Sequence, residues 1–473
     1  MNEPLSSGVA GGMATPVPAG AVVQPGAYAG SLTRQLRVRD GLAVAIGMII
    51  GAGILRTPGL IAAYLGDAWV ILGTWLLGGV IAGLSTLLLA EMAAAMPAAG
   101  GKYVYARAAW GRTAGFVAGW NEMLTGRSFT GAAKAVVIAE YATGLAGRGS
   151  VPVIAGTVVI AFALLHLGGL KVGTRFQNIT TVLKIIVLGG IAAAGILAGD
   201  AAGFSEPAVV APEYVGLLGF ALAYQAVAFA YYGWEDAAKL SEEVHDPARS
   251  LPRILIGGAT AVAAVYLLIN FAFLTALTPA QMAGSDLVAR DAIAGVFGDG
   301  AARAVQFCGL LILISSLNVN FLATPRVAYA LARDGLAPRA FLHISPRGTP
   351  TYALFFISAL ILGLAVTGAF EWLVRFFILC AIIVDLVVLL GFFRLRMTRP
   401  DLHRPLRVPG YPWLPAVAII LQIAVLAAIV TTQPGLTFGA LGLIGSLVVI
   451  GWLVTARQGP AAGATADPTQ PLP

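Results

Sequence analysis

The feature that most constrains this chain is a series of long apolar runs. Each has about 17–25 residues, the length that an α-helix needs to cross roughly 30 Å of hydrocarbon. Backbone polar groups cannot stay unpaired in lipid, so each run is expected to be a helix and not an isolated strand. We count twelve runs, over residues 41–65, 68–95, 113–145, 151–170, 174–198, 214–240, 254–277, 301–331, 351–368, 371–395, 413–432 and 435–456.

The balance of apolar and charged residues excludes most other classes of protein. Of the 473 residues, 58% are hydrophobic and only 11% charged, whereas soluble domains average about 25% charged residues. These charges are too few to cover the surfaces of soluble domains. The composition rules out an ordinary soluble enzyme, a disordered chain and a disulfide-stapled secreted module. It predicts an integral protein of the lipid bilayer.

The basic residues predict the orientation in the membrane. Twenty-one of the 29 Lys and Arg residues fall in one set of loops and four in the opposite set. Because cytoplasmic loops carry the excess of basic residues, both termini are expected in the cytoplasm. The net charge of +7 is explained in this way without a nucleic-acid partner. The uncharged stretch 4–33 lacks the features of a secretory signal, so no cleavage is expected. We expect a multi-pass protein of the cell (inner) membrane.

Two of the predicted spans contain unusual segments. Span 1 contains a group of closely spaced glycines, Gly47, Gly51 and Gly53, followed by Pro58. These small residues are explained either by close helix packing or by an unwound turn, since glycine and proline weaken a helix. An unwound turn would expose amide donors at the start of a half-helix, which suit an anionic group such as a carboxylate.

Span 6 carries Gly233, Glu235 and Asp236 within an apolar run. Acids in lipid are costly unless they face a cavity. Spans 1 and 6 are the first helices of two five-helix halves. Paired interruptions at matching places in two halves indicate a transporter site between inverted repeats.

Four motifs in this order resemble those of the amino acid–polyamine–organocation (APC) transporters, and among them the L-type amino acid transporter branch. They are Gly51-Ala52-Gly53-Ile54; Pro97 with Gly100-Gly101-Lys102-Tyr103-Val104-Tyr105; Phe229-Ala230-Tyr231 and Gly233-Trp234 through Glu242-Glu243-Val244-His245-Asp246-Pro247; and Ser315-Ser316-Leu317-Asn318 with Arg333-Asp334-Gly335-Leu336-Ala337-Pro338.

The resemblance implies an all-α integral membrane fold of twelve transmembrane helices. It is a leucine-transporter-like 5+5 inverted repeat with broken helices 1 and 6, plus two extra helices. The expected parts are an N-terminal tail (1–39), the transport core (40–396), a loop with helices 11 and 12 (397–457) and a C-terminal tail (458–473).

The resemblance also implies a site for an amino acid substrate. Its α-carboxylate would meet the amides of Gly51, Ala52 and Gly53, and its α-amino group would meet carbonyls on both broken spans. Tyr232 departs from the family's usual glycine, and its phenol either narrows the side-chain pocket or points away from it. The expected substrate-binding residues are Ile49, Ile50, Gly51, Ala52, Gly53, Ile54, Phe229, Ala230, Tyr231, Tyr232 and Gly233.

Lys184 lies deep in span 5, where a lysine is a functional hypothesis by default. It matches a lysine that, in relatives, takes the place of a sodium ion. We expect its ammonium to bind carbonyls of span 1 and the hydroxyls of Ser315 and Ser316. The leading hypothesis is therefore a sodium-independent amino acid transporter working by alternating access, either as an exchanger or coupled to protons.

Other charged residues leave an alternative open. Polyamine or other cationic-substrate transport would use Glu122, Glu235 or Asp236 as partners of the cation. Arg127 and Lys134 are seven residues apart and share one helical face. With Glu122 and Glu140 beside them, they form either an interhelical charge network or a substrate contact. Asp385, in span 10, is expected to be paired.

Several other classes are not supported by the sequence. The four histidines, His166, His245, His343 and His403, do not cluster as metal ligands do, so no metal site and no membrane enzyme is expected. No cofactor motif or nucleotide-binding loop occurs. In the eukaryotic L-type branch, a cysteine between spans 3 and 4 tethers a partner subunit. The corresponding loop, 144–151, has no cysteine, so no disulfide-linked partner is expected.

Overall fold

A computed structural model describes residues 37–457 except 99, 169 and 200. The predicted C-terminal tail and all but the last three residues of the predicted N-terminal tail lie outside the described residues. Regular secondary structure in the described part is helical, and the β-pairing there is a single bridge between Ile344 and Pro350. The helices are α1 (Val38–Ile49), α2 (Ala52–Leu65), α3 (Ala68–Ala95), α4 (Lys102–Trp110), α5 (Arg112–Asn121), η1 (Glu122–Phe129), α6 (Thr130–Ala146), α7 (Val151–Leu167), α8 (Leu170–Ala198), η2 (Ala202–Phe204), η3 (Pro212–Tyr214), α9 (Leu217–Tyr231), η4 (Asp236–Glu243), α10 (Pro247–Ala276), α11 (Pro279–Ala283), α12 (Val288–Arg333), η5 (Arg339–Leu342), α13 (Thr351–Ala365), α14 (Phe370–Thr398), α15 (Trp413–Thr432) and α16 (Pro434–Arg457).

Many of these helices are long and apolar enough to cross a membrane. Among the described residues, seven meet this condition alone, or nine if each of two bent pairs is one span. The bent pairs are α1 with α2, at 41°, and the α5–α6 segment with α7, at 118°. Helices α9 and α13 are apolar but shorter. The chain is thus a multi-pass membrane protein, and the count of twelve spans stays a prediction.

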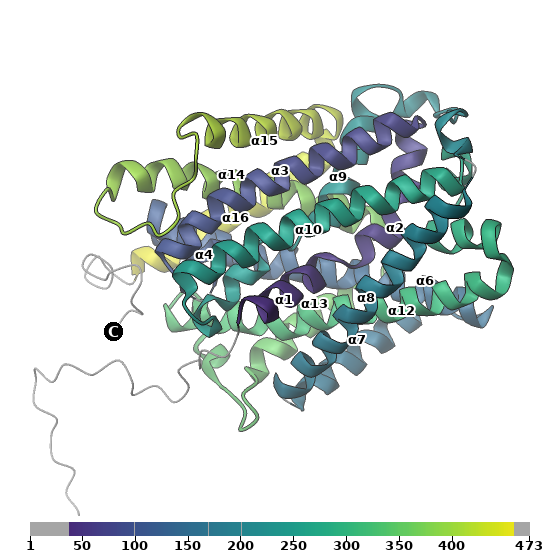
Figure 1. Cartoon of the computed structure of the whole chain (residues 1–473). Coiled ribbons are helices and arrows are strands. Elements are labelled where there is room, and N and C mark those ends of the chain that lie inside the picture. Colours follow the sequence, from purple (N-terminus) through teal and green to yellow (C-terminus); the bar gives the residue numbers. More distant parts are fainter. Residues whose placement is uncertain (1–36, 99, 169, 200, 458–473) are drawn as a thin grey trace, which may run out of the picture. The chain divides into compact units, whose positions relative to one another are not determined.

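The broken helices pack among long, apolar neighbours. Helix α2 packs against α9, and α10 packs against α1, α3 and α8. Figure 1 shows α3 and α10 lying side by side. Large apolar side chains such as Leu197, Phe438 and Trp413 are exposed on the helices. Exposed apolar surface of this kind marks contact with a membrane or a partner.

Three of the predicted spans contain local irregularities in the structure. Span 3 contains a π-helix, η1, between α5 and α6. Span 6 was expected to run over residues 214–240, but its α-helix ends at Tyr231 and a 3₁₀-helix follows from Asp236. Span 8 was expected to begin near residue 301. Helix α12, from Val288, is interrupted at Gly298 (φ +76°), so the helix that matches span 8 begins just after this kink. The interruption of span 6 falls where its glycine predicted one, and the helix after the Gly298 kink begins close to the expected start of span 8.

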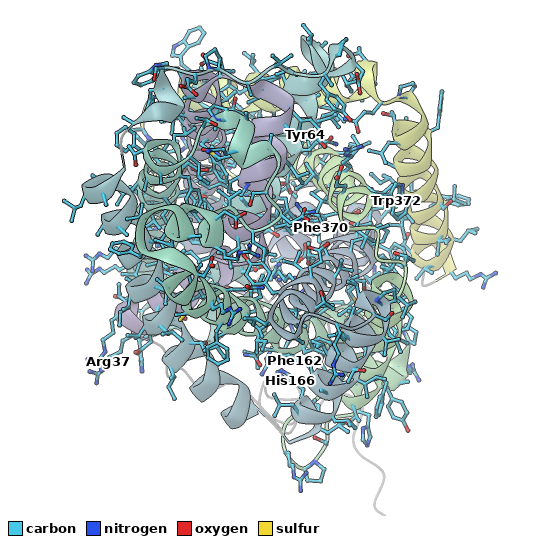
Figure 2. All side chains as sticks on the ribbon, turned by 90° about the vertical axis from the view of Figure 1, so that its right-hand side faces the viewer. Arg37, Tyr64, Phe162, His166, Phe370 and Trp372 are labelled. Carbon is cyan, nitrogen blue, oxygen red and sulfur yellow. The ribbon has the colours of Figure 1, made fainter. Side chains whose placement is uncertain are left out.

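Two pairs of aromatic residues lie in opposite halves of the described part of the chain. Figure 2 shows Tyr64 and Trp372 in one half, and Phe162 and His166 in the other. Tyr64 receives a hydrogen bond from Arg375 (2.8 Å), which also pairs with Glu371.

Candidate functional site

The first helix is interrupted at two residues. Helix α1 ends at Ile49, Ile50 is extended (φ −69°, ψ 109°), and α2 starts at Ala52 after Gly51. The first amides of a helix have no partner within it, so this break turns free N–H groups toward its surroundings. The interruption falls at the glycines that pointed to an unwound turn in the sequence.

The second interruption follows α9. Tyr232 is extended (φ −66°, ψ 137°), and Gly233 has φ +116°, a conformation that favours glycine. The chain continues as the 3₁₀-helix η4, which contains Asp236 and Lys239. This break is longer than the first and carries charged side chains.

The two breaks touch each other. A Cβ atom on Gly53 would lie 2.3 Å from the Cα atom of Ala230, so only glycine allows this approach. Tyr266, on α10, joins the breaks a second time. Its hydroxyl lies 3.0 Å from the Ile49 carbonyl and 3.1 Å from the Ala230 carbonyl. Sequence reasoning missed Tyr266, because a tyrosine in an apolar run gives no sign that it bridges two other spans.

A cavity lies between the breaks, span 3 and α12. The hydroxyl oxygen of Ser316 is buried there and has no hydrogen-bond partner in the described part of the chain. Buried polar atoms are usually paired, so an unpaired one in a cavity suits a polar ligand. The cavity is lined by Ile49, Gly51, Ala52, Gly53, Gly126, Arg127, Thr130, Lys134, Phe229, Tyr232, Gly233, Asp236 and Ser316.

The remaining predicted site residues lie around this cavity and not on its wall. Ile54 is fully buried in the core. The Tyr231 hydroxyl donates to the Trp75 carbonyl (3.1 Å) on α3. The lining does not include these two residues or Ile50, Ala230, Lys184 and Ser315.

Lys184 holds the carbonyl side of the first break. Its ammonium is fully buried and donates to the carbonyls of Gly47 (2.7 Å) and Ile50 (2.9 Å). The expected bonds to serine hydroxyls are not among the hydrogen bonds of the described residues. Instead, the Ser315 hydroxyl pairs with that of Thr180 (2.6 Å).

A buried ionic cluster surrounds the second break. Glu122 pairs with Arg127 (2.7 Å) and Lys239 (2.5 Å), and Asp236 pairs with both of these cations. Sequence reasoning missed the part of Lys239 in the cluster. Its spacing of three and four residues from Asp236 and Glu235 was a signal that could have revealed it.

Lys102 extends this cluster to α14. It lies at the start of α4, outside the candidate spans, and pairs with Glu235 and Asp385. Asp385 is therefore paired, as predicted. Burial lowers the pKa of Lys102, and the charge of Asp385 opposes that shift.

Three carboxylates in the cluster are close enough together to suggest a metal site. Ligand atoms of Glu122, Glu235 and Asp236 lie within 4.8 Å of one another. However, the basic residues Lys102, Arg127 and Lys239 already bind these oxygens. The arrangement is that of an ion-pair network and does not fit a divalent cation.

The residues of span 3 divide between two roles. Arg127 belongs to the ionic cluster, which agrees with the network interpretation. Glu140 does not join it, and pairs instead with Arg56 on α2 (3.2 Å). Lys134 donates to the Asn320 side chain (2.9 Å) and the Ser316 carbonyl (3.3 Å), both uncharged.

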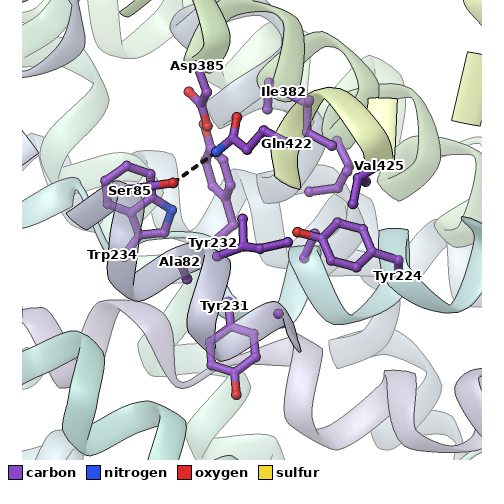
Figure 3. Close-up of a pocket in the computed structure, with 15 residues that line it drawn as sticks. Ala82, Ser85, Tyr224, Tyr231, Tyr232, Trp234, Ile382, Asp385, Gln422 and Val425 are labelled. Carbon is purple, nitrogen blue, oxygen red and sulfur yellow. Dashed lines mark hydrogen bonds between the residues drawn. The ribbon is translucent and has the colours of Figure 1, made fainter. Parts of the chain in front are cut away.

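Tyr232 separates the central cavity from a second one. It lines both, and its hydroxyl accepts a hydrogen bond from Lys102 (2.8 Å). The phenol hydroxyl is thus directed to α4, which favours the alternative in which the side chain points away from the substrate. Figure 3 shows the second cavity, where the Gln422 amide donates to the Ser85 hydroxyl (2.9 Å).

Comparison with known proteins places the chain in a family. A profile described as amino acid permease matches residues 38–455. The chain belongs to the amino acid permease family. The APC resemblance seen in the sequence is confirmed by this match and by relatives in the L-type branch.

Three relatives illustrate the similarity. The serine/threonine exchanger SteT of Bacillus subtilis is 30% identical over 409 residues, covering 85% of this chain and 92% of its own. The b(0,+)-type amino acid transporter 1 of Mus musculus is 25% identical and covers 85% and 84%. The Asc-type amino acid transporter 1 of Mus musculus is 28% identical and covers 80% and 73%. This permease is thus related to amino acid transporters and exchangers over most of its length.

Proposed function

We propose that this permease is a sodium-independent secondary transporter of amino acids that works by alternating access. The observation that carries the proposal is the pair of facing breaks. Free amides at the start of α2 and the unpaired Ser316 hydroxyl suit a carboxylate. Carbonyls of the same breaks suit an ammonium group. An amino acid carries both groups at a fixed separation.

The contacts of Tyr266 leave room for the α-amino group. A phenol has one hydrogen, so it donates to the Ile49 carbonyl or to the Ala230 carbonyl at any moment. The other carbonyl remains available to the substrate. The backbone carbonyl oxygens of Phe229 and Tyr232 also have lone pairs that can accept a hydrogen bond from it. Gly51, Ala52 and Gly53 would hold the α-carboxylate at the opposite side of the cavity.

Lys184 supports sodium independence. Its ammonium supplies a fixed positive charge to the carbonyls of Gly47 and Ile50. In many transporters, carbonyls of an unwound helix coordinate the coupling ion. We propose that Lys184 replaces sodium and that substrate exchange or proton coupling drives transport.

The cationic-substrate alternative has less support. Glu122, Glu235 and Asp236 would be its binding residues, but each is already paired with buried basic residues. A polyamine would have to displace one of these pairs. The relatives named above are amino acid transporters.

The proposal includes the membrane arrangement expected from the sequence. Twelve spans result if the helices bent by 118° are two spans and if the short helices α9 and α13 also cross. We propose that the permease lies in the cell (inner) membrane. With the excess of basic residues on the cytoplasmic side, both termini are then cytoplasmic. The loop 144–151 has no cysteine, so the proposal includes no disulfide-linked subunit.

Transport by proteoliposomes tests the proposal. Purified protein is reconstituted, and uptake of each labelled amino acid is measured in sodium-free buffer, with and without internal amino acid and with an imposed pH gradient. We expect uptake without sodium. Stimulation only by internal substrate would establish exchange, and stimulation only by external acid would establish proton coupling. Strict dependence on sodium would contradict the role of Lys184, and uptake of polyamines alone would establish the alternative.

A further inference from the structure

Lys134 is a basic residue in the central cavity without an acidic partner. Its side chain is half-buried and lines the cavity together with Gly51 and Ser316. Its ammonium contacts the Asn320 amide oxygen and the Ser316 carbonyl. In the part of the chain that the structure describes, no carboxylate lies within ion-pair distance of it.

The other buried basic residues near the two breaks differ from Lys134. Lys102, Arg127 and Lys239 each pair with two or more carboxylates. Lys184 is held by two carbonyls of a broken helix. Lys134 has only neutral oxygens and opens onto the cavity. An ammonium taken out of water without a counter-ion is costly, so its position favours an anionic ligand.

The carboxylate that lines the cavity is already paired with other basic residues. Asp236 is the acidic residue that lines it among the described residues, and Arg127 and Lys239 bind that carboxylate. Among the described residues, no carboxylate that lines the cavity is therefore left to form an ion pair with Lys134. A substrate with a cationic side chain would be repelled by Lys134 and Arg127. A substrate with an anionic side chain would be attracted by the Lys134 ammonium.

The cavity has two separate features that suit carboxylates. One is the set of amides at the start of α2, and the other is the Lys134 ammonium on α6. A neutral amino acid has one carboxylate and satisfies only one of them. We propose that this permease carries amino acids with an acidic side chain, such as aspartate or glutamate, and that Lys134 binds the side-chain carboxylate. The inference rests on the proposed function and deepens it.

Selective loss of acidic substrates tests this assignment. Proteoliposomes with the wild-type protein, Lys134→Gln, Lys134→Arg and the control Arg303→Gln are compared for uptake of labelled aspartate and serine. Arg303 is exposed on α12, so its variant removes one positive charge away from the cavity. We expect wild-type uptake of aspartate, and a fall of at least about tenfold in the aspartate-to-serine ratio of kcat/KM for Lys134→Gln. Lys134→Arg should keep most of that ratio, and Arg303→Gln all of it.

The outcomes separate this inference from the proposed function. Uptake of neutral amino acids without uptake of or inhibition by aspartate or glutamate would overturn the inference alone. An equal loss of serine and aspartate uptake in a folded Lys134→Gln protein would also overturn it, because Lys134 would then serve the α-carboxylate or the α6–α12 contact. Absence of uptake of any amino acid would overturn the proposed function. The wild-type measurement remains decisive if a variant does not fold.

Discussion

The two helix breaks are stabilised in different ways. In the first, two residues, Ile50 and Gly51, are non-helical, and both are uncharged. Its freed carbonyls are held by one ammonium, that of Lys184. The second extends from Tyr232 through the 3₁₀-helix η4 and is held by a cluster of ion pairs.

The two breaks therefore differ in which groups the protein itself satisfies. In the first, the protein satisfies the carbonyl side and leaves amides for a ligand. In the second, Asp236 and Glu235 tie the chain to span 3 and α4. Removing one partner of a buried ion pair leaves the other uncompensated and costs about 3–5 kcal/mol. The second break is therefore fixed by its ionic partners, whereas the first leaves the amides that the proposed substrate site would use.

The largest effect is expected where the breaks meet. In Gly53→Ala, the added Cβ would lie 2.3 Å from the Cα atom and 3.0 Å from the nitrogen of Ala230. Backbone must shift to relieve this contact, so we expect amino acid uptake to fall to background. The matched control is Gly73→Ala, since a Cβ there has no neighbour within 4 Å. Normal uptake by Gly53→Ala would show that the breaks need not touch.

The next largest effect is expected at the second break, which carries the charged side chains. Asp236→Asn leaves Arg127 and Lys239 with less negative charge around them. We expect it to destabilise the protein by about 3–5 kcal/mol, measured as a lower unfolding temperature in detergent. The control is Glu213→Gln, because Glu213 is exposed. If both variants unfold at the same temperature, the ionic cluster does not hold the second break.

Much of this arrangement can be predicted from the sequence, and the reasons are local. Apolar runs give the approximate positions of the long helices, because lipid leaves few alternatives to a helix. Glycines such as Gly51 and Gly233 mark both breaks, since a weakened helix is a property of a few consecutive residues. The lysine at 184 is conspicuous because a charge stands alone in an apolar run.

What could not be predicted depends on contacts between distant segments. Lys102 looks like an ordinary loop cation and Lys239 like a residue at the end of a span, until the fold brings them to Glu235 and Glu122. The π-helix η1 has no distinctive composition. Tyr266 bridges the breaks only because α10 lies across both of them. Burial and pairing of a side chain are decided by residues far away in the chain.

A smaller effect is expected at the first break, whose residues are uncharged. Lys184→Met keeps an unbranched side chain but removes the ammonium, which leaves the carbonyls of Gly47 and Ile50 without this donor. An unsatisfied buried acceptor costs about 1–3 kcal/mol, so we expect uptake in sodium-free buffer to fall by about tenfold or more. Ile185→Met is the control, since Ile185 is exposed on the same helix. Wild-type uptake by Lys184→Met would remove the distinction between the breaks.

The smallest effect concerns the residue shared by both breaks. Tyr266→Phe keeps the ring against Trp75 and Tyr231 but removes the hydroxyl between the Ile49 and Ala230 carbonyls. One hydrogen bond contributes about 1 kcal/mol, which corresponds to about a fivefold fall in kcat/KM for amino acid uptake. The control is Tyr352→Phe, on an exposed residue. Because both carbonyls would then be free for the α-amino group, an increase in substrate affinity would mean that Tyr266 competes with the substrate and does not brace the breaks.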